Sequence, residues 1–511
     1  MTNYPTISGT ASARELAVAD GATLNMTTGT LTVGWGWEDN GGFNATGGTV
    51  VFAGPIGVTV TSSSSFQNVQ IGTGADTSVV SLEGNVDING NLHIQAGASF
   101  DASSYAIHLA GNWTEDDATG FTSSGTSTVV FDGSNQTVSK VTNVSLLNED
   151  FSSYSTSCCT TGKPSGWANS DGSYYQGDLI VDGDGAANRW RNQTDGYLYT
   201  PALNLQKGVI YQLQYDVAIR QNFSDGDASL SPQTVSVHLG NAQSSTAMTT
   251  ILSNESTETS TTYETRTISN ITVATSGTYY IGFRAQQSGD DYTSFDDISL
   301  TGVGSISFYN LLVSSGTTTF GGDVRVDNNL QTDNGGTIDF LTNSITVEGT
   351  VINNGAIKQT KTATNSTTTV FGWIKNAAGT SDNYYGLEIT PSSGSMGETT
   401  VEIKGNQTCS GSGVPAAGVK RCYTVTPVSS QAADVKFYYR SAESNSNTTP
   451  DVYLQTGGSW AAQATSAHGG SNEAIWATGS GLTSYGTFSL SSGASSNSTG
   501  FLPAIFLLLL K

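Results

Sequence analysis

The chain has 511 residues, of which 36% are hydrophobic, only 12% are charged and 60 are glycine. Its 21 Tyr, 18 Phe and 8 Trp exclude a disordered chain, and its length predicts two to four domains. The formal net charge of −23 disfavours nucleic acid as a partner, because a phosphate-binding protein needs a basic face.

A repeated pattern of short strands begins close to the first residue. Residues 16–37 align without a gap with residues 92–113, at an offset of 92 − 16 = 76 residues, and a third copy begins at Leu330. The alignment places Trp37 on Trp113, so the two tryptophans are predicted to hold equivalent positions. Self-similarity at a long fixed period is typical of stacked architectures.

The segments within these copies alternate apolar and polar residues, and Gly, Asn, Asp and Ser separate them. This alternation is the pattern of half-buried strands, and long amphipathic helical patterns are absent. We therefore predict a parallel β-solenoid for residues 1–147, in which one copy makes roughly three coils. An array of β-sandwiches is the alternative that the same alternation permits.

The solenoid pattern stops at "VTNVSLLN" and resumes at "SISFYNLLV". Phe66 and Asn68 before the gap match Phe308 and Asn310 after it. Residues 148–302 are therefore predicted to form a separate domain inserted into the repeat array. Insertions of this kind are tolerated at exposed loops whose ends lie close together.

The insert has its own order of motifs: "NEDFSS", "PSGWAN", "DGYLYTPALNL", "VIYQLQYDVAIR" and "SFDDISLTG". This order resembles the bacterial jelly-roll modules related to MAM and cleaved-adhesin (choice-of-anchor type) domains. The flanking repeats, with "GNWT", "TVVFDG" and "FYNLLV", resemble β-solenoid repeats of bacterial surface proteins. The resemblance implies a β-sandwich that presents a binding surface on a solenoid stalk.

After the solenoid continues through residues 303–372, residues 373–490 again alternate like strands. This region resembles the sandwich modules that end exported bacterial repeat proteins. The predicted fold is therefore all-β: parallel β-solenoid repeats interrupted by a jelly-roll insert, with a C-terminal β-sandwich-like domain. Cys409 and Cys422 flank a Gly- and Pro-containing loop and could form a disulfide in an exported chain.

Four carboxylates of the insert are candidate metal ligands. A jelly roll brings its first and last strands together, which would gather Glu149 and Asp150 with Asp296 and Asp297. Carboxylate oxygens are the ligands that calcium prefers, and the resembled family often carries a structural calcium in this region. We expect a structural Ca²⁺ here; the alternative is that these side chains point to water.

Aromatic residues of the insert are candidate ligand contacts. Trp167, Trp190, Tyr197 and Tyr199 could stack on sugar rings, because amphipathic aromatics suit that role. Packing in the core of the sandwich is the alternative. In the solenoid, Glu115 begins an acidic cluster that reads as a solvated loop, and a hidden glycosidase pair is the alternative there.

No catalytic motif is present: the sequence lacks a nucleophile elbow, a zinc-protease motif and a phosphate-binding loop. We therefore expect a non-enzymatic bacterial adhesin-like protein, secreted or at the cell surface, that binds an extracellular glycan or protein. One alternative is a structural subunit of a surface layer or filament. The other is a carbohydrate-active enzyme built on a β-helix.

Residues 491–511 form a Ser/Gly/Asn linker followed by "FLPAIFLLLLK". This order resembles the C-terminal sorting tails of bacterial surface proteins, which a protease removes. We expect the mature protein to end before Phe501, with membrane contact only through this tail before processing. The first residues lack a signal-peptide pattern, so the chain is expected to begin inside a longer protein.

Overall fold

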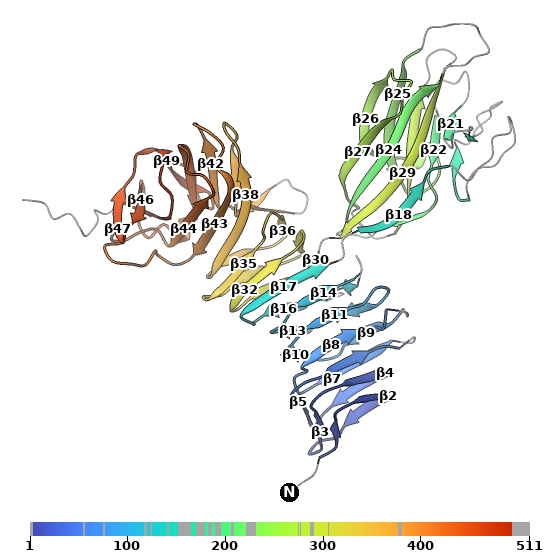
Figure 1. The fold of residues 1–511 in the computed structure, drawn as a ribbon, viewed down its shortest axis with the longest axis horizontal. Helices are drawn as coiled ribbons and strands as arrows, with labels where there is room; N and C mark the ends of the chain where they lie inside the picture. Colours follow the sequence, from blue (N-terminus) through green and yellow to red (C-terminus); the bar gives the residue numbers. More distant parts are fainter. Residues whose placement is uncertain are drawn as a thin grey trace, which may run out of the picture. The chain divides into compact units, whose positions relative to one another are not determined.

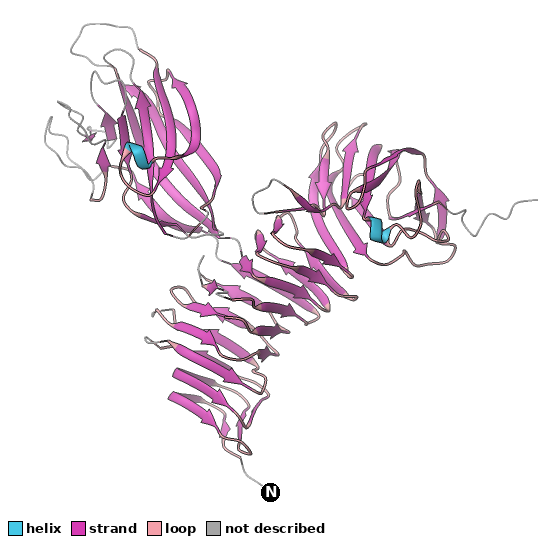
Figure 2. Ribbon diagram, turned by 180° about the vertical axis from the view of Figure 1, so that it is seen from behind, coloured by secondary structure: helices cyan, strands magenta, loops and turns pink. Residues whose placement is uncertain are grey.

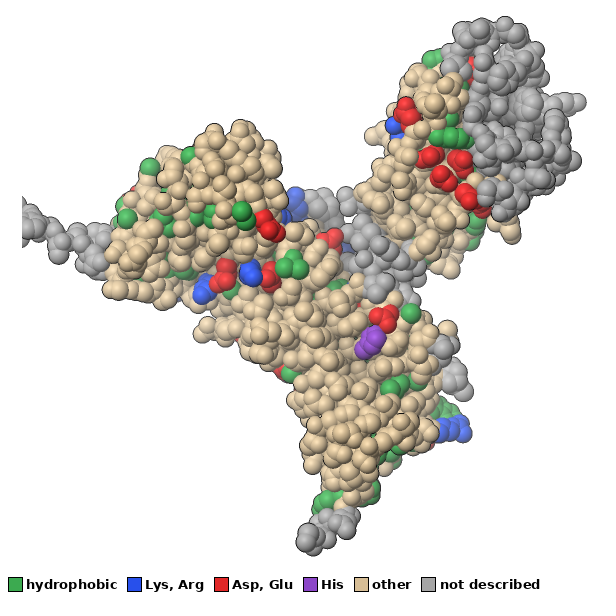
Figure 3. Space-filling view, in the orientation of Figure 1, with side chains coloured by type: hydrophobic (Ala, Val, Ile, Leu, Met, Phe, Trp, Pro, Cys, Tyr) green, Lys and Arg blue, Asp and Glu red, His purple; other side chains and the backbone are tan. Residues whose placement is uncertain are grey.

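The computed structural model is almost entirely β, with 60% of the chain in strands and 1% in helix. Figure 2 shows the helix as two short turns among the strands. The surface seen in Figure 3 is mostly backbone and uncharged polar side chains. The structure describes residues 4–492 except for 55–56, 75–76, 117–119, 123–124, 141–142, 152–164, 170–178, 182–186, 190–195, 206–208, 221–230, 274, 276, 287–290, 305 and 377–380. Within these residues, no helix is long and apolar enough to cross a membrane.

The chain divides into two compact units. One contains Met1–Asp116, Gly120–Lys140 and Ile306–Lys511, and the other contains Val141–Ser305 with Asp117–Thr119. The first unit holds a β-solenoid and a C-terminal sandwich, and the second is the insert, whose extent is slightly wider than the 148–302 expected from sequence. Cys158, Cys159 and residues 493–511, which include the expected sorting tail, lie outside the described residues.

The solenoid is a stack of coils (Figure 1), and its strands form three faces. The strands before the insert are β1 (Thr6–Ile7), β2 (Thr10–Val18), β3 (Thr23–Met26), β4 (Thr30–Asp39), β5 (Gly42–Ala45), β6 (Thr49–Phe52), β7 (Val58–Ser62), β8 (Asn68–Ile71), β9 (Val79–Leu82), β10 (Val86–Ile88), β11 (Leu92–Ile94), β12 (Ser99–Asp101), β13 (Ala106–Leu109), β14 (Trp113–Glu115), β15 (Phe121–Thr122), β16 (Thr128–Phe131) and β17 (Asn135–Lys140). After the insert come β30 (Ile306–Phe308), β31 (Asn310–Val313), β32 (Gly316–Phe320), β33 (Val324–Val326), β34 (Leu330–Thr332), β35 (Gly336–Asp339), β36 (Ile345–Val347) and β37 (Val351–Asn353).

Parallel pairing between successive coils defines the three faces. On face 1, β11 pairs with β14; on face 2, β12 pairs with β15; on face 3, β13 pairs with β16. Leu92 is the register partner of Trp113, so one coil here takes 113 − 92 = 21 residues. Strands β2 and β4 are long enough to run along both face 1 and face 2.

Apolar columns fill the inside of the stack, because alternate side chains of each strand point inward. One such column on face 1 follows the register from coil to coil, and all its members are buried: Leu31, Val50, Val69, Leu92, Trp113 and Val138. The alternation read from the sequence therefore predicts the inward positions of these strands correctly.

A ladder of asparagines holds the corner between face 3 and face 1. The Oδ1 of Asn68 accepts a hydrogen bond from the backbone N–H of Asn91 at 3.0 Å, and Asn91 repeats this with Asn112 at 2.8 Å. Asn112 in turn accepts from the N–H of Thr137 at 2.9 Å. Each amide oxygen satisfies a backbone donor that the turn would otherwise leave unpaired.

The 76-residue offset is not a whole number of coils. Leu16, Trp37, Val60 and Leu82 are successive register partners on face 2, so Leu82 lies three coils beyond Leu16, and Leu92 lies two faces further on. The prediction of roughly three coils per copy, with equivalent tryptophans, is therefore corrected. Trp37 belongs to face 2 and Trp113 to face 1.

The two tryptophans nevertheless have similar surroundings. Both side chains are buried, and each indole packs against three phenylalanines within about 6.4 Å between ring centroids. The phenylalanines around Trp37 are Phe43, Phe52 and Phe66, and those around Trp113 are Phe121, Phe131 and Phe308. The sequence repeat thus records one packing arrangement placed on two faces of the solenoid.

The solenoid register continues across the insert. Strand β17 pairs with β14 before it and with β32 after it, and β16 pairs with β31. The chain leaves face 1 after Lys140 and re-enters at β30, which lies against β15 on face 2. The previous coil makes the same passage between Glu115 and Phe121, so the insert occupies the position of a corner loop.

The insert is a sandwich of two antiparallel sheets. Its first sheet has the order β20-β21-β29-β24-β27 with β18 also on β29, and its second has the order β19-β22-β28-β25-β26 with β23 also on β28. The elements are β18 (Asn143–Glu149), β19 (Ala168–Asn169), β20 (Leu179–Val181), β21 (Ala187–Arg189), β22 (Gly196–Tyr199), β23 (Leu203–Leu205), β24 (Val209–Arg220), β25 (Gln233–Gly240), η1 (Ser245–Ala247), β26 (Thr250–Glu258), β27 (Glu264–Ile271), β28 (Gly277–Gln286) and β29 (Tyr292–Gly304). Apolar side chains from both sheets, including Leu213, Val237, Phe283 and Leu300, form one core between them.

The C-terminal sandwich shares strand β38 with the last coil of the solenoid. Strand β38 pairs in parallel with β35 of the solenoid and antiparallel with β43 of the sandwich. The elements are β38 (Ala356–Ala363), β39 (Thr369–Phe371), β40 (Ile374–Lys375), β41 (Asp382–Tyr384), β42 (Leu387–Pro391), β43 (Gly397–Gly405), β44 (Arg421–Pro427), β45 (Ala433–Tyr439), η2 (Ser441–Glu443), β46 (Asp451–Thr456), β47 (Ser459–Ala462), β48 (Thr465–Gly469), β49 (Ile475–Leu482) and β50 (Thr487–Ser491).

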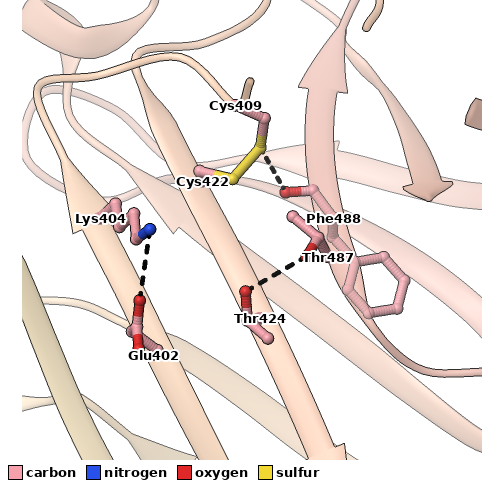
Figure 4. The surroundings of a disulfide bond; sticks show 7 residues. All are labelled: Glu402, Lys404, Cys409, Cys422, Thr424, Thr487 and Phe488. Carbon is pink, nitrogen blue, oxygen red and sulfur yellow. Dashed lines mark hydrogen bonds and ion pairs between the residues drawn. A yellow bond between two sulfur atoms is a disulfide. The ribbon is translucent and has the colours of Figure 1, made fainter. Parts of the chain in front are cut away.

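Cys409 and Cys422 are joined by a disulfide, with their Cα atoms 4.9 Å apart (Figure 4). The bond ties the loop before β44 to that strand, and the Cys409 Sγ lies 3.1 Å from the carbonyl oxygen of Phe488 on β50. Both cysteines are buried in a small apolar cluster with Tyr453 and Trp460. The bridge therefore belongs to a small cluster that is separate from the main core of the sandwich.

Candidate functional site

The first and last strands of the insert lie side by side. Strand β18 runs antiparallel to β29, and Glu149 is the register partner of Ile298. On its other side β29 pairs with β24, where Asp216 lies opposite Asp296. The register then shifts, and Asp297 has a φ of 45°, so β29 contains a β-bulge at this point.

The four carboxylates expected to bind calcium do not gather at one point. Asp296 shares the outward face with Asp216, whereas Glu149 lies opposite Ile298, whose side chain is fully buried. In the described part of the chain, no three His, Cys, Asp or Glu side chains are arranged so that they could hold a metal ion. A calcium site formed by these residues stays a prediction.

Glu149 is nonetheless in an unusual environment for a carboxylate. Its Oε1 accepts a hydrogen bond from the backbone N–H of Phe151 at 2.9 Å. Burial raises the pKa of the Glu149 carboxyl, and the neighbouring charge of Asp150 raises it further, although the Phe151 hydrogen bond acts in the opposite direction. A cation would favour the charged form of such a carboxylate.

The predicted aromatic contacts separate into buried and partly exposed residues. Trp167 is 3% exposed and packs against Phe151 in the core, with ring centroids 5.2 Å apart. Tyr199 is fully buried, so neither of these rings has a face open to a sugar, which corrects the expectation for both. Tyr197 is half-buried, and Trp190 lies outside the described residues.

Tyr197 belongs to a row of polar and aromatic side chains on the outward face of the second insert sheet. It is the register partner of Arg284 on β28, which in turn pairs with Ser236 on β25. The Tyr197 ring stacks on Tyr199 at 5.5 Å and meets the edge of His238 at 5.6 Å. We call Tyr197, Ser236, His238 and Arg284 the outward row.

Charge and hydrogen bonding fix the members of this row. Arg284 Nη1 lies 3.1 Å from Glu255 Oε1 on β26, and the Arg284 side chain is 23% exposed. Ser236 Oγ lies 2.9 Å from His238 Nε2. Ser236 and His238 are buried, at 3% and 7% exposure, so within the row only Tyr197 and Arg284 are open to a ligand.

A glycine makes space for the aromatic ring of Tyr197. A Cβ atom on Gly282 would lie 2.9 Å from Met248 Sδ and 3.0 Å from Tyr197 Cδ1, too close for either side chain. Nearby, the side chain of Gln243 joins two other segments of the insert, because its Nε2 donates to the carbonyl oxygens of Gly166 and Thr200 at 2.7 Å each. Gly282 therefore leaves room for the side chains of Met248 and Tyr197.

Sequence reasoning missed three of the four members of the outward row. The segment "TVSVHLG" alternates, and its apolar members Val235, Val237 and Leu239 face the core. The alternation could have placed Ser236 and His238 together on the opposite face. Nothing in the sequence could have placed Arg284 beside Tyr197, because that pairing depends on the order of strands in the sheet.

Comparison with known proteins finds no matching family model and no matching curated protein. Among solved structures, the chain is similar to the K3 cleaved adhesin domain of Lys-gingipain from Porphyromonas gingivalis, with 19% identity and a TM-score of 0.22 over 31% of this chain and 99% of that one. It is also similar to TmCBM61 solved with β-1,4-galactotriose (18% identity, TM-score 0.21, 27% and 90% covered). A third is the enzymatically active domain of bacteriophage CBA120 tailspike protein 4, with 8% identity and a TM-score of 0.20 over 58% of this chain and 63% of that one.

Proposed function

We propose that this protein is a non-enzymatic, adhesin-like binding protein of bacterial type, secreted or held at the cell surface, in which the solenoid is a stalk and the insert is the ligand-binding module. The observation that carries the proposal is the pairing of β17 with β32 and of β16 with β31. The insert interrupts the chain without interrupting the coil register. A module attached in this way is free to diverge in its loops and surface while the stalk stays intact.

The proposed ligand is a glycan, bound on the outward row of the insert. A half-buried tyrosine next to a guanidinium offers an apolar ring face together with hydrogen-bond donors. Sugars present the same combination, with C–H faces and hydroxyl edges. The Cys409–Cys422 disulfide supports an oxidising compartment outside the cytoplasm.

A glycan array probed with the full chain tests this proposal. Tyr197→Ala and Arg284→Gln should each weaken binding to the recognised glycan at least tenfold. Val428→Ala on the C-terminal sandwich removes a side chain that is 78% exposed and should leave binding unchanged. Undiminished binding by both row variants would argue against the outward row as the glycan site.

Protein ligands and enzyme activity give different results in the same experiment. Binding to a protein partner without any glycan signal would keep the insert as a binding module and replace the ligand class. Release of soluble sugar from a polysaccharide panel would instead support a carbohydrate-active enzyme. A chain lacking residues 141–305, bridged by a short Gly/Asn loop, should stay folded and lose the insert's ligand.

A further inference from the structure

Trp35 lies on the outside of the solenoid although the alternation of β4 would place it inside. Leu31 and Val33 of that strand are buried, but the next buried apolar residue is Trp37. Val33 is the register partner of Ala13 and Gly36 of Glu15, so two residues of β4 lie opposite the single residue Arg14 of β2. At this β-bulge Trp35 turns outward, and Trp37, four residues after Val33, points inward again.

Arg14 holds the exposed indole in place. Its guanidinium carbon lies 3.7 Å from the centre of the Trp35 ring, which is the geometry of a cation–π contact. Trp35 is 41% exposed, one of the few large apolar side chains in the described chain that water reaches to this extent. An aromatic ring that is both exposed and held rigidly loses little conformational entropy when a ligand covers it.

A cleft of about 400 Å³ opens beside this indole, lined by Glu15, Trp35, Gly36, Gly57, Thr59 and Ser81. Its volume falls within the range of small-molecule binding sites. Two glycines keep it open. A Cβ atom on Gly36 would lie 3.7 Å from Glu15 Cγ and 3.8 Å from Thr59 Oγ1, and one on Gly57 would meet only the carbonyl oxygen of Val79, at 3.9 Å. A larger side chain at Gly36 would therefore fill the cleft without a backbone clash.

Hydrogen-bonding side chains continue the cleft along the stack. Gly36 is the register partner of Thr59, Thr59 of Ser81, and Ser81 of Asp101, all at outward positions of face 2. Glu15 precedes them on β2. Successive members stand one strand spacing apart, about 4.8 Å, so hydroxyl and carboxylate groups form a line that starts at Trp35.

We propose that this cleft is a second binding site, for a neutral oligosaccharide that lies along the line with one ring stacked on Trp35. The indole suits the apolar face of a sugar, and the carboxylates of Glu15 and Asp101 can accept hydrogen bonds from its hydroxyl groups. The net charge of −23 disfavours anionic glycans. The site belongs to the stalk, so it does not depend on the glycan site proposed for the insert.

Hydrogen–deuterium exchange of the full chain with a panel of neutral hexaoses (cello-, manno-, galacto- and malto-oligosaccharides) tests the proposal. At least one hexaose should slow exchange in β2, β4 and β7. Trp35→Ala and Gly36→Val should each weaken binding at this site at least tenfold, the first by removing the stacking surface and the second by filling the cleft. Val428→Ala, which changes an apolar side chain that is 78% exposed on the C-terminal sandwich, should not alter it.

The same measurement separates the two sites. Protection of β22 and β28 reports the insert, and Tyr197→Ala should abolish that protection while leaving the protection of β4 intact. Circular dichroism melts check that both cleft variants are folded. The proposal is overturned if none of the hexaoses protects β2, β4 or β7, or if Trp35→Ala and Gly36→Val, both folded, retain the parent's affinity there.

Discussion

Lys140 Nζ lies 3.2 Å from Glu115 Oε1 inside the solenoid, with 3% and 1% of the two side chains exposed. The two residues are register partners on adjacent coils, at the end of a column whose earlier members are Val33, Phe52, Ile71 and Ile94. Glu115 was expected in a solvated loop, and its burial overturns that expectation. The ion pair lies where the chain leaves for the insert.

Replacing Lys140 with Met should destabilise the solenoid strongly at neutral pH. Burial raises the pKa of the Glu115 carboxyl from 4.5, and the nearby charge of Lys140 opposes that increase. A carboxyl with a raised pKa in the folded state costs stability once the pH exceeds its unfolded value, so the loss should grow as pH rises above about 4.5. We expect Lys140→Met to lower the free energy of unfolding by about 3–5 kcal/mol at pH 7 and by clearly less at pH 5.

Denaturant unfolding at both pH values measures the effect, and the Glu115→Gln/Lys140→Met double variant is the control. The double variant removes the buried charge and should recover most of the lost stability with little pH dependence. An equal loss for Lys140→Met at pH 5 and pH 7 would show that the cost comes from packing and not from the uncompensated carboxylate.

Deletions should distinguish one coil from one sequence repeat. Val69 and Leu92 are register partners, so removing residues 69–91 joins Asn68 to Leu92 and preserves every face. Removing residues 16–91 joins a face 2 position to a face 1 position. Because each coil contacts mainly its neighbours, the first deletion should leave a cooperative melt. In the second, residues 4–15 lose their register on the next coil and should become sensitive to protease. Limited proteolysis provides the measurement, and equal resistance of both deletions would contradict the face assignment.

Reducing the Cys409–Cys422 bond should destabilise the C-terminal sandwich. The two cysteines are 13 residues apart, and closing a loop of about 15 residues is worth about 3 kcal/mol. The Cys409→Ala/Cys422→Ala variant should lower the melting temperature of the sandwich without affecting the insert, which forms a separate unit. Calorimetry resolves the two transitions, and a matched loss in the insert transition would show that the effect is not local.

The pairing of Asp216 with Asp296 allows a direct test of calcium binding by the insert. Asp216 and Asp296 lie directly opposite each other on β24 and β29, where like charges destabilise a sheet. Calcium should raise the melting temperature of the insert transition, since a ligand that binds only the native state stabilises it. Asp296→Ala combined with Asp297→Ala should remove the rise, and Asp216→Ala should reduce it. Identical melts in calcium and in chelator would end the metal hypothesis.

The sequence alone determines the strand class and the inward positions of this protein. Alternation with a period of two is a local property, so Val69 and Leu92 could be assigned to the core without any partner strand. The match of Phe66 and Asn68 to Phe308 and Asn310 similarly indicates that the solenoid resumes after the insert, because corner residues repeat from coil to coil.

Tertiary structure decides what depends on a neighbouring strand. The bulge that turns Trp35 outward exists only because β2 offers one residue against two of β4, and the burial of Glu115 requires Lys140 on the next coil. Register is set by packing between strands that are distant in the chain, and a period-two pattern carries no information about which strand lies alongside.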